Sequence, residues 1–150
     1  MMNNLLLPLR QAARFDQALS RLFNNLQPLA LLAARLYVGW VFFASGLTKI
    51  DDWETTLFLF ELEYAVPLLS PEVAAWLGTA GELILPVLLF AGLLTRFSAL
   101  GLSVVNVVAV ISLAEIAPAA LALHILWGVI LGINILWGAG KLSLDSLLSS

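Results

Sequence analysis

The chain has 150 residues, of which 61% are hydrophobic and only 11% are charged, and its net charge is -3 at pH 7. Soluble domains average about a quarter charged residues, and a chain this short cannot bury so much apolar surface in a single soluble core. Its basic residues are scattered, which argues against nucleic-acid binding, and it has no cysteine for disulfides, thiolate catalysis or iron–sulfur ligation. We therefore expect an all-α integral membrane protein.

The first 27 residues precede the long apolar stretches and carry an amphipathic pattern. On a helix, apolar side chains between Leu9 and Leu26 share one face and polar side chains share another. This pattern predicts an interfacial helix in the headgroup layer, with a soluble extension as the alternative. The apolar face holds Phe15, Leu19, Leu22 and Leu26, and the polar face holds Arg10, Arg14, Gln17 and Arg21.

Four later segments are long and apolar enough to cross a bilayer, which needs roughly 20 apolar residues. The connection around Thr95 is tight, and Pro118 can begin a helix but cannot continue one. We therefore predict a four-helix transmembrane bundle over residues 28–138, followed by a tail at 139–150. The predicted spans are residues 28–48, 73–94, 97–117 and 119–137.

Lysine and arginine are distributed unevenly between the two ends of this bundle. With four spans, Lys49 lies at one end and five other basic residues lie at the opposite end. The positive-inside rule then predicts that both termini are cytoplasmic, in a multi-pass protein that we expect in the bacterial inner (cytoplasmic) membrane. A cleaved signal peptide is the competing interpretation of the first span, but Arg35 inside the apolar stretch argues against it. The five basic residues are Arg10, Arg14, Arg21, Arg96 and Lys141.

The first connection, which this orientation places outside the membrane, is long and acidic. Trp53, Leu57, Phe60 and Tyr64 recur in it at helical spacing. Aromatic residues are enriched at membrane interfaces, so we expect this segment to rest on the outer leaflet or to cap the bundle.

Two charged residues lie well inside predicted spans, away from the span ends, where a central charge costs roughly 2.5–3.5 kcal/mol on insertion scales. Arg35 lies about two turns into the first span. Glu82 lies near the middle of the second, four residues before Pro86. A structural Arg35–Glu82 ion pair is one interpretation, and snorkelling of Arg35 toward the headgroups is another. The functional interpretation makes both residues catalytic, at a site where Glu82 binds or exchanges a proton with a polar headgroup.

Further polar residues lie near the other ends of the spans. Lys49, Glu115 and His124 fall at similar depth and are predicted to form a small polar cluster, and Asn106 is expected to join helices by hydrogen bonding. One histidine and one glutamate fall short of the three or more ligands of a good metal site, so no metal is predicted. The candidate binding residues are Arg35, Lys49, Glu82, Asn106 and His124.

Glycines mark the faces on which helices can approach closely. Gly39 and Gly46 share a face of the first span with Arg35 and Lys49. Gly128 and Gly132 form a Gly-x-x-x-Gly pair in the fourth span, which predicts packing within the chain or in a dimer.

Two groups of residues carry a resemblance to a known family. The first runs through Ala34, Arg35, Leu36, Gly39, Phe43, Gly46, Lys49 and Trp53, and the second through residues 78–83, Pro86 and residues 92–96. On these residues the chain resembles the DoxX family of small four-helix membrane proteins, over roughly Leu31 to Ala139. Its relatives include a subunit of thiosulfate:quinone oxidoreductase, proteins grouped with membrane redox complexes, and companions of enzymes that make metal-binding peptides.

The resemblance favours a membrane subunit of a quinone-linked redox assembly that receives electrons from a partner protein. Glu82, Arg35 and His124 would then meet the quinone headgroup. Quinone is the cofactor expected, and no haem, flavin or iron–sulfur cluster is predicted in this chain, so whether it is itself an oxidoreductase stays open.

Two alternatives remain. One is a non-catalytic membrane anchor or assembly factor, and the other is a transporter of a small solute or metal that would need a homo-oligomer. The expected partners are the lipid bilayer and another redox protein or membrane subunit, and no nucleic acid.

Overall fold

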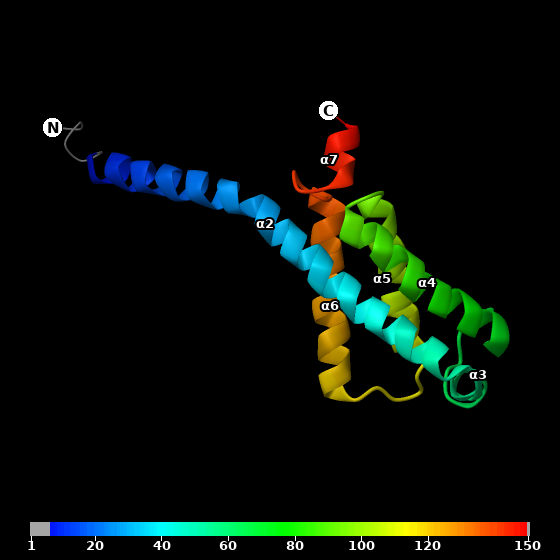
Figure 1. Cartoon of the computed structure of the whole chain (residues 1–150). Helices are drawn as coiled ribbons and strands as arrows, with labels where there is room; N and C mark the ends of the chain where they lie inside the picture. Colours follow the sequence, from blue (N-terminus) through cyan, green and yellow to red (C-terminus); the bar gives the residue numbers. More distant parts are fainter. Residues whose placement is uncertain (1–6, 150) are drawn as a thin grey trace.

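A computed structural model describes residues 7–149, which are helical with short connections and contain no β-strand. Residues 1–6 of the predicted amino-terminal segment and residue 150 of the predicted tail lie outside the described part. Figure 1 shows the helices and places both ends of the described chain at the same end of the molecule. The helices are α2 (Leu7–Asp51), α3 (Trp53–Leu62), α4 (Pro71–Ala91), α5 (Thr95–Ile111), α6 (Pro118–Trp137) and α7 (Leu144–Leu148).

Four of these helices form an apolar bundle. Three of them, α2, α4 and α6, are long and apolar enough to cross a membrane, and α5 is a shorter apolar helix of 17 residues. Helix α5 ends at Ile111 rather than at the predicted residue 117. The following Ser112 directs its hydroxyl to the carbonyl of Val108 at 2.6 Å, and its own carbonyl accepts the N–H of Ala65 at 2.9 Å. Residues 112–117 therefore form a turn that is tied to the first connection.

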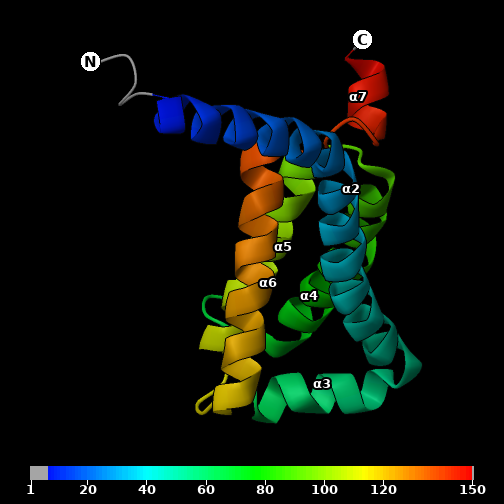
Figure 2. The ribbon, with the colours of Figure 1, turned by 90° about the vertical axis from the view of Figure 1, so that its left-hand side faces the viewer.

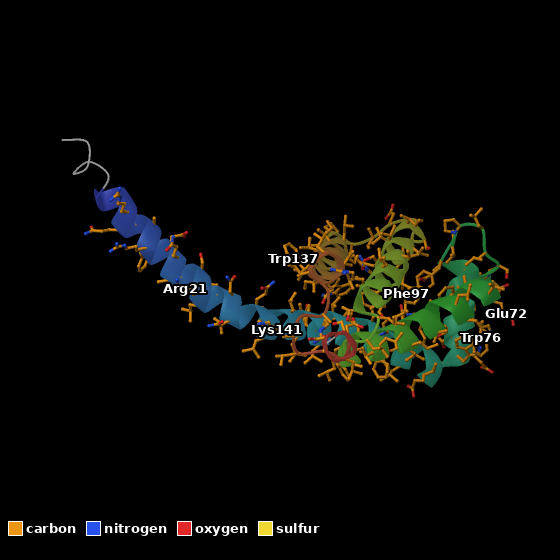
Figure 3. The ribbon with its side chains drawn as sticks, turned by 90° about the horizontal axis from the view of Figure 1, so that it is seen from above. Arg21, Glu72, Trp76, Phe97, Trp137 and Lys141 are labelled. Atoms are coloured by element: carbon orange, nitrogen blue, oxygen red, sulfur yellow. The ribbon has the colours of Figure 1, made fainter. Side chains whose placement is uncertain are left out.

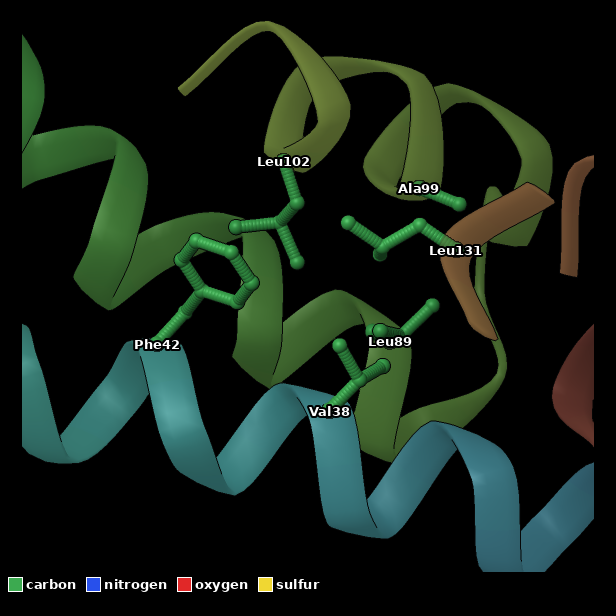
Figure 4. Packing of buried hydrophobic residues seen from close by; sticks show 6 residues of the cluster. All are labelled: Val38, Phe42, Leu89, Ala99, Leu102 and Leu131. Atoms are coloured by element: carbon green, nitrogen blue, oxygen red, sulfur yellow. The ribbon is translucent and has the colours of Figure 1, made fainter. Parts of the chain in front are cut away.

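The core lies where α2, α4, α5 and α6 meet. Lipid tails are as apolar as leucine, so packing of these side chains is favoured by close van der Waals contact rather than by escape from water. Helix α5 packs against both α4 and α6, and α2 packs mainly against α4. Figure 4 shows the central cluster, which consists of Val38, Phe42, Leu89, Ala99, Leu102 and Leu131.

The amino-terminal part of α2 is not a separate helix, since α2 continues through Pro28 into the first span. Proline removes one helical hydrogen bond and crowds the carbonyl four residues earlier, which bends a helix without having to end it. In Figures 1 and 2 the part before Pro28 runs crosswise to α6 at the end where both termini lie.

A second crosswise helix, α3, closes the opposite end of the bundle (Figure 2). Asp52 caps it, because its two carboxylate oxygens accept from the N–H of Thr55 at 2.9 Å and from the Thr55 hydroxyl at 2.6 Å. These two hydrogen bonds lower the pKa of the exposed Asp52. Phe60 packs on α4, and the Trp53 ring lies 4.4 Å from that of Trp76.

The segment after α6 folds back onto the bundle. Gly138 and Gly140 both have positive φ, at 73° and 72°, a conformation that glycine adopts without steric penalty. The reversal brings α7 against the turn between α4 and α5, where Asp145 N–H donates to the carbonyl of Gly92 at 2.8 Å. We call residues 138–149 the carboxy-terminal strap.

Candidate functional site

The carboxylate of Glu82 is paired with Lys49. The Lys49 ammonium lies 2.6 Å from Glu82 Oε2 and also donates to Ser45 Oγ at 2.9 Å. The two charged side chains are 21% and 9% exposed, so the pair lies between α2 and α4 with access on the lysine side. A carboxylate beside an ammonium and a hydroxyl is a group that can accept and release a proton.

Two glycines set the register between α2 and α4. A Cβ at Gly46 would lie 3.2 Å from Glu82 Cβ and closer still to Leu83, and a Cβ at Gly39 would collide with the Phe90 ring. The two helices are thus antiparallel, with Gly46 beside Glu82 and Gly39 beside Phe90. Gly39 and Gly46 therefore lie in the contact between these two helices.

This register rules out the pairing of Arg35 with Glu82 that the sequence suggested. Arg35 precedes Lys49 by 14 residues on α2, which is about 21 Å along a helix. Its Nη1 donates to the carbonyl of Leu89 at 3.3 Å and its Nη2 donates to the carbonyl of Leu142 at 2.5 Å. The guanidinium is fully buried, so it does not snorkel to a headgroup either.

Asp145 of the strap completes the group around Arg35. Helix α5 has no cap from its own side chains, and instead the N–H groups of Leu94 and Thr95 donate to the two Asp145 oxygens at 2.8 Å and 3.0 Å. Partial burial alone would raise the pKa of this carboxyl, but the hydrogen bonds from Thr95 and Leu94 and the charge of Arg35 together hold that pKa below its usual value. A negative charge at a helix amino terminus is also favoured by the helix dipole.

Gly92 allows the strap and Arg35 to meet. It has a φ of 64°, and a Cβ added to it would collide with Arg35 Nη1 and with Ser143 Cβ. On the neighbouring side, Arg96 donates from Nε to the carbonyl of Ile135 at 3.0 Å and so binds the last turn of α6. We call Arg35, Gly92 and Asp145 with their backbone partners the strap lock.

Asn106 and His124 form a third polar group, between α5 and α6. Asn106 Nδ2 donates to the His124 carbonyl at 2.9 Å, and its Oδ1 lies 2.8 Å from His124 Nδ1. Because the amide oxygen can only accept, Nδ1 must carry the proton, which leaves Nε2 as an acceptor in the neutral ring. The Trp127 ring meets the imidazole edge to face at 4.9 Å.

The predicted cluster of Lys49, Glu115 and His124 does not form. Lys49 bonds to Ser45 and Glu82, His124 bonds to Asn106, and Glu115 lies exposed in the turn before α6. Within residues 10–149 no hydrogen bond or ion pair joins the Glu82 group to the His124 group. The candidate binding residues are therefore divided among three places.

Only one glycine of the Gly-x-x-x-Gly pair of α6 packs against another helix among the described residues. Gly128 lies against Asn106, whose Nδ2 would be 3.5 Å from an added Cβ. Gly132 has no neighbouring atom within 4 Å of such a position among the described residues.

Sequence reasoning missed Ser45 as a partner of Lys49, although the two are four residues apart on one helix face. It also missed Asp145. Two features of the sequence could have indicated this cap. Asp145 is the single acidic side chain of the tail, and the helix that begins at Thr95 has no capping side chain of its own.

The comparisons with known proteins bear on these residues. The DoxX family model matches residues 30–115, which include Arg35, Lys49, Glu82 and Asn106. An uncharacterized protein of Haemophilus influenzae is 38% identical over 128 residues, covering 79% of this chain and 83% of that protein. No solved structure matches the chain. The chain belongs to the DoxX family and is a multi-pass membrane protein.

Proposed function

We propose that this chain is the membrane subunit of a quinone-linked redox assembly and receives electrons from a partner protein. The observation that carries this proposal is the Lys49–Glu82 pair, a buried carboxylate held by an ammonium and a hydroxyl inside an apolar bundle. The resemblance supports the proposal as well, since relatives in the family include a subunit of thiosulfate:quinone oxidoreductase. The proposal places the bundle in the bacterial inner membrane with both termini cytoplasmic.

The donor set of this group fits a quinone headgroup. An ammonium has three N–H donors, and Ser45 and Glu82 use two of those of Lys49, so one remains for a carbonyl oxygen. The adjacent Leu83 side chain provides an apolar surface beside this group. A bound quinone would supply two-electron, two-proton chemistry. Lys49 would orient its carbonyl oxygen and Glu82 would hold or release the proton at Oε2.

The test compares purified membrane protein carrying Glu82→Gln with the unaltered chain. Both are extracted in mild detergent, and mass spectrometry measures bound quinone and co-purifying proteins. Loss of a charged hydrogen-bond partner is worth about 1.5–3 kcal/mol, so bound quinone should fall about ten-fold or more.

Glu115→Gln is the matched control, since it removes an exposed carboxylate from a turn. It should leave both quinone and the redox partner in place. Absence of quinone from the unaltered chain, or equal quinone in both variants, would contradict the proposal.

A second candidate function, a membrane anchor or assembly factor, is favoured by the strap lock. Arg35 is fully buried and donates to main-chain carbonyls, which cannot exchange a proton with it. In this role the chain presents a fixed surface to a partner. If Glu82→Gln retained both partner and activity while Arg35→Gln lost the protein from the membrane, the anchor role would replace the redox role.

A further inference from the structure

Among the residues that the structure describes, no element packs against the part of α2 before Pro28. Nearly every residue from 10 to 27 is exposed, including large apolar side chains: Phe15 is 68% exposed, Leu22 is 55% and Phe23 is 62%. Figure 3 shows this arm, with Arg21 labelled, projecting away from the bundle. An arm of this composition must bury its apolar face against something beyond its own chain.

The arm has two well-separated faces. At 3.6 residues per turn, its polar row falls within roughly 60° of the helix circumference and its apolar row within roughly 100° on the opposite side. The polar row contains three arginines, and Asp16 on the flank is the one acidic residue between 7 and 27. The polar row is Arg10, Arg14, Gln17 and Arg21, and the apolar row is Phe15, Leu19, Leu22, Phe23 and Leu26.

The position of the arm indicates which kind of surface can cover its apolar face. The arm is continuous with the first membrane span, and Figure 2 shows it lying crosswise to α6. It therefore leaves the bundle at the level where the apolar span ends, which is the headgroup region of the bilayer. Residues 10–27 reach about 27 Å along this surface.

We infer that this arm is a recognition surface for anionic phospholipid in the leaflet next to the chain termini. Its apolar row lies at the boundary between headgroups and acyl chains, and its three arginines contact lipid phosphates. A basic residue at an anionic surface strengthens binding by about five-fold, so the three together favour an anionic leaflet over a neutral one by about a hundred-fold.

The chain contains no cysteine, which makes the test direct. A nitroxide label is placed on the full chain at Leu22→Cys, in the apolar row, or at Gln17→Cys, in the polar row. Each protein is reconstituted in nanodiscs of phosphatidylcholine alone or with phosphatidylglycerol, and collisions with oxygen and with a water-soluble nickel complex are measured. With phosphatidylglycerol, the label at 22 should meet oxygen and lose the nickel complex, whereas the label at 17 keeps it.

Replacement of Arg10, Arg14 and Arg21 by glutamine should abolish the effect of phosphatidylglycerol, and replacement by lysine should retain it. Shielding of position 22 that is equal in both lipids would overturn the inference, since apolar contact with lipid or with protein, and not the anionic headgroup, would then cover the arm. So would nickel access at position 22 in both lipids, or shielding of position 17.

Discussion

The two ends of the contact between α2 and α4 each hold a basic residue, but the residues do different things. Arg35 is fully buried and donates to carbonyls of Leu89 and Leu142, so its partners belong to the backbone. Lys49 is 21% exposed, and its partners are the side chains of Ser45 and Glu82. Main-chain carbonyls fix a shape, whereas a carboxylate can also move a proton. Arg35 therefore stabilises the fold at its end of the contact, whereas the Lys49–Glu82 pair is the candidate for chemistry at the other end.

The largest effect is expected for Arg35→Gln. It leaves the carbonyls of Leu89 and Leu142 without their donor, and each buried acceptor left unsatisfied costs about 1–3 kcal/mol. We expect loss of folded protein from membranes, measured by fluorescence-detected size exclusion. Arg35→Lys should restore little, because an ammonium lacks the planar fork that reaches two carbonyls. Normal yield of Arg35→Gln would refute the architectural role.

Gly92→Ala tests the same end through the backbone. The left-handed conformation costs a residue with a Cβ about 1–2 kcal/mol, and the added methyl also displaces Arg35 or Ser143. We expect a total of about 2–3 kcal/mol, read from the thermal midpoint in detergent. Gly132→Ala is the control, since open space surrounds that position and alanine favours a helix. Equal midpoints for both variants would contradict the close approach at Gly92.

Asp145→Ala should cost about 1–2 kcal/mol, because it removes the cap of α5. Since the folded-state pKa of Asp145 is lowered, its contribution to stability is present above the ordinary aspartate pKa and is lost as the pH falls through the folded-state value. The unaltered chain should therefore lose stability in acid more steeply than Asp145→Ala, as followed by unfolding at a series of pH values. Asp16→Ala, on the exposed arm, should leave the profile unchanged. Parallel profiles of the unaltered chain and Asp145→Ala would contradict the cap.

The smallest effect is expected at the other end. A double-mutant cycle of Lys49→Met and Glu82→Gln should give a coupling of about 1 kcal/mol, because the lysine is partly exposed and solvent weakens the pair. The measurement is unfolding of the four proteins in detergent. A coupling as large as the loss in Arg35→Gln would make this pair architectural too and would remove the contrast between the two ends.

The apolar spans were predictable because their composition leaves few alternatives, and the crosswise α3 followed from the spacing of Trp53, Leu57 and Phe60. The register between α2 and α4 was not predictable. The sequence suggested an Arg35–Glu82 ion pair, but Gly46 lets Glu82 lie beside the carboxyl end of α2, where Lys49 is the nearer cation.

The strap was also beyond sequence reasoning. Its contacts join Asp145 to residues about 50 positions earlier, and no local pattern encodes such a distance. The early end of α5 depends likewise on a bond between Ser112 and Ala65, in a different connection.

The bond between Arg35 and Leu142 has a consequence for biogenesis. Leu142 follows Arg35 by 107 residues, so the ribosome needs roughly 5–20 s after making the arginine to deliver its partner. During that interval the guanidinium lacks its Leu142 partner, and until Leu89 has been made, 54 residues after Arg35, it lacks both partners. The contacts of the first span are therefore complete only when translation is almost finished.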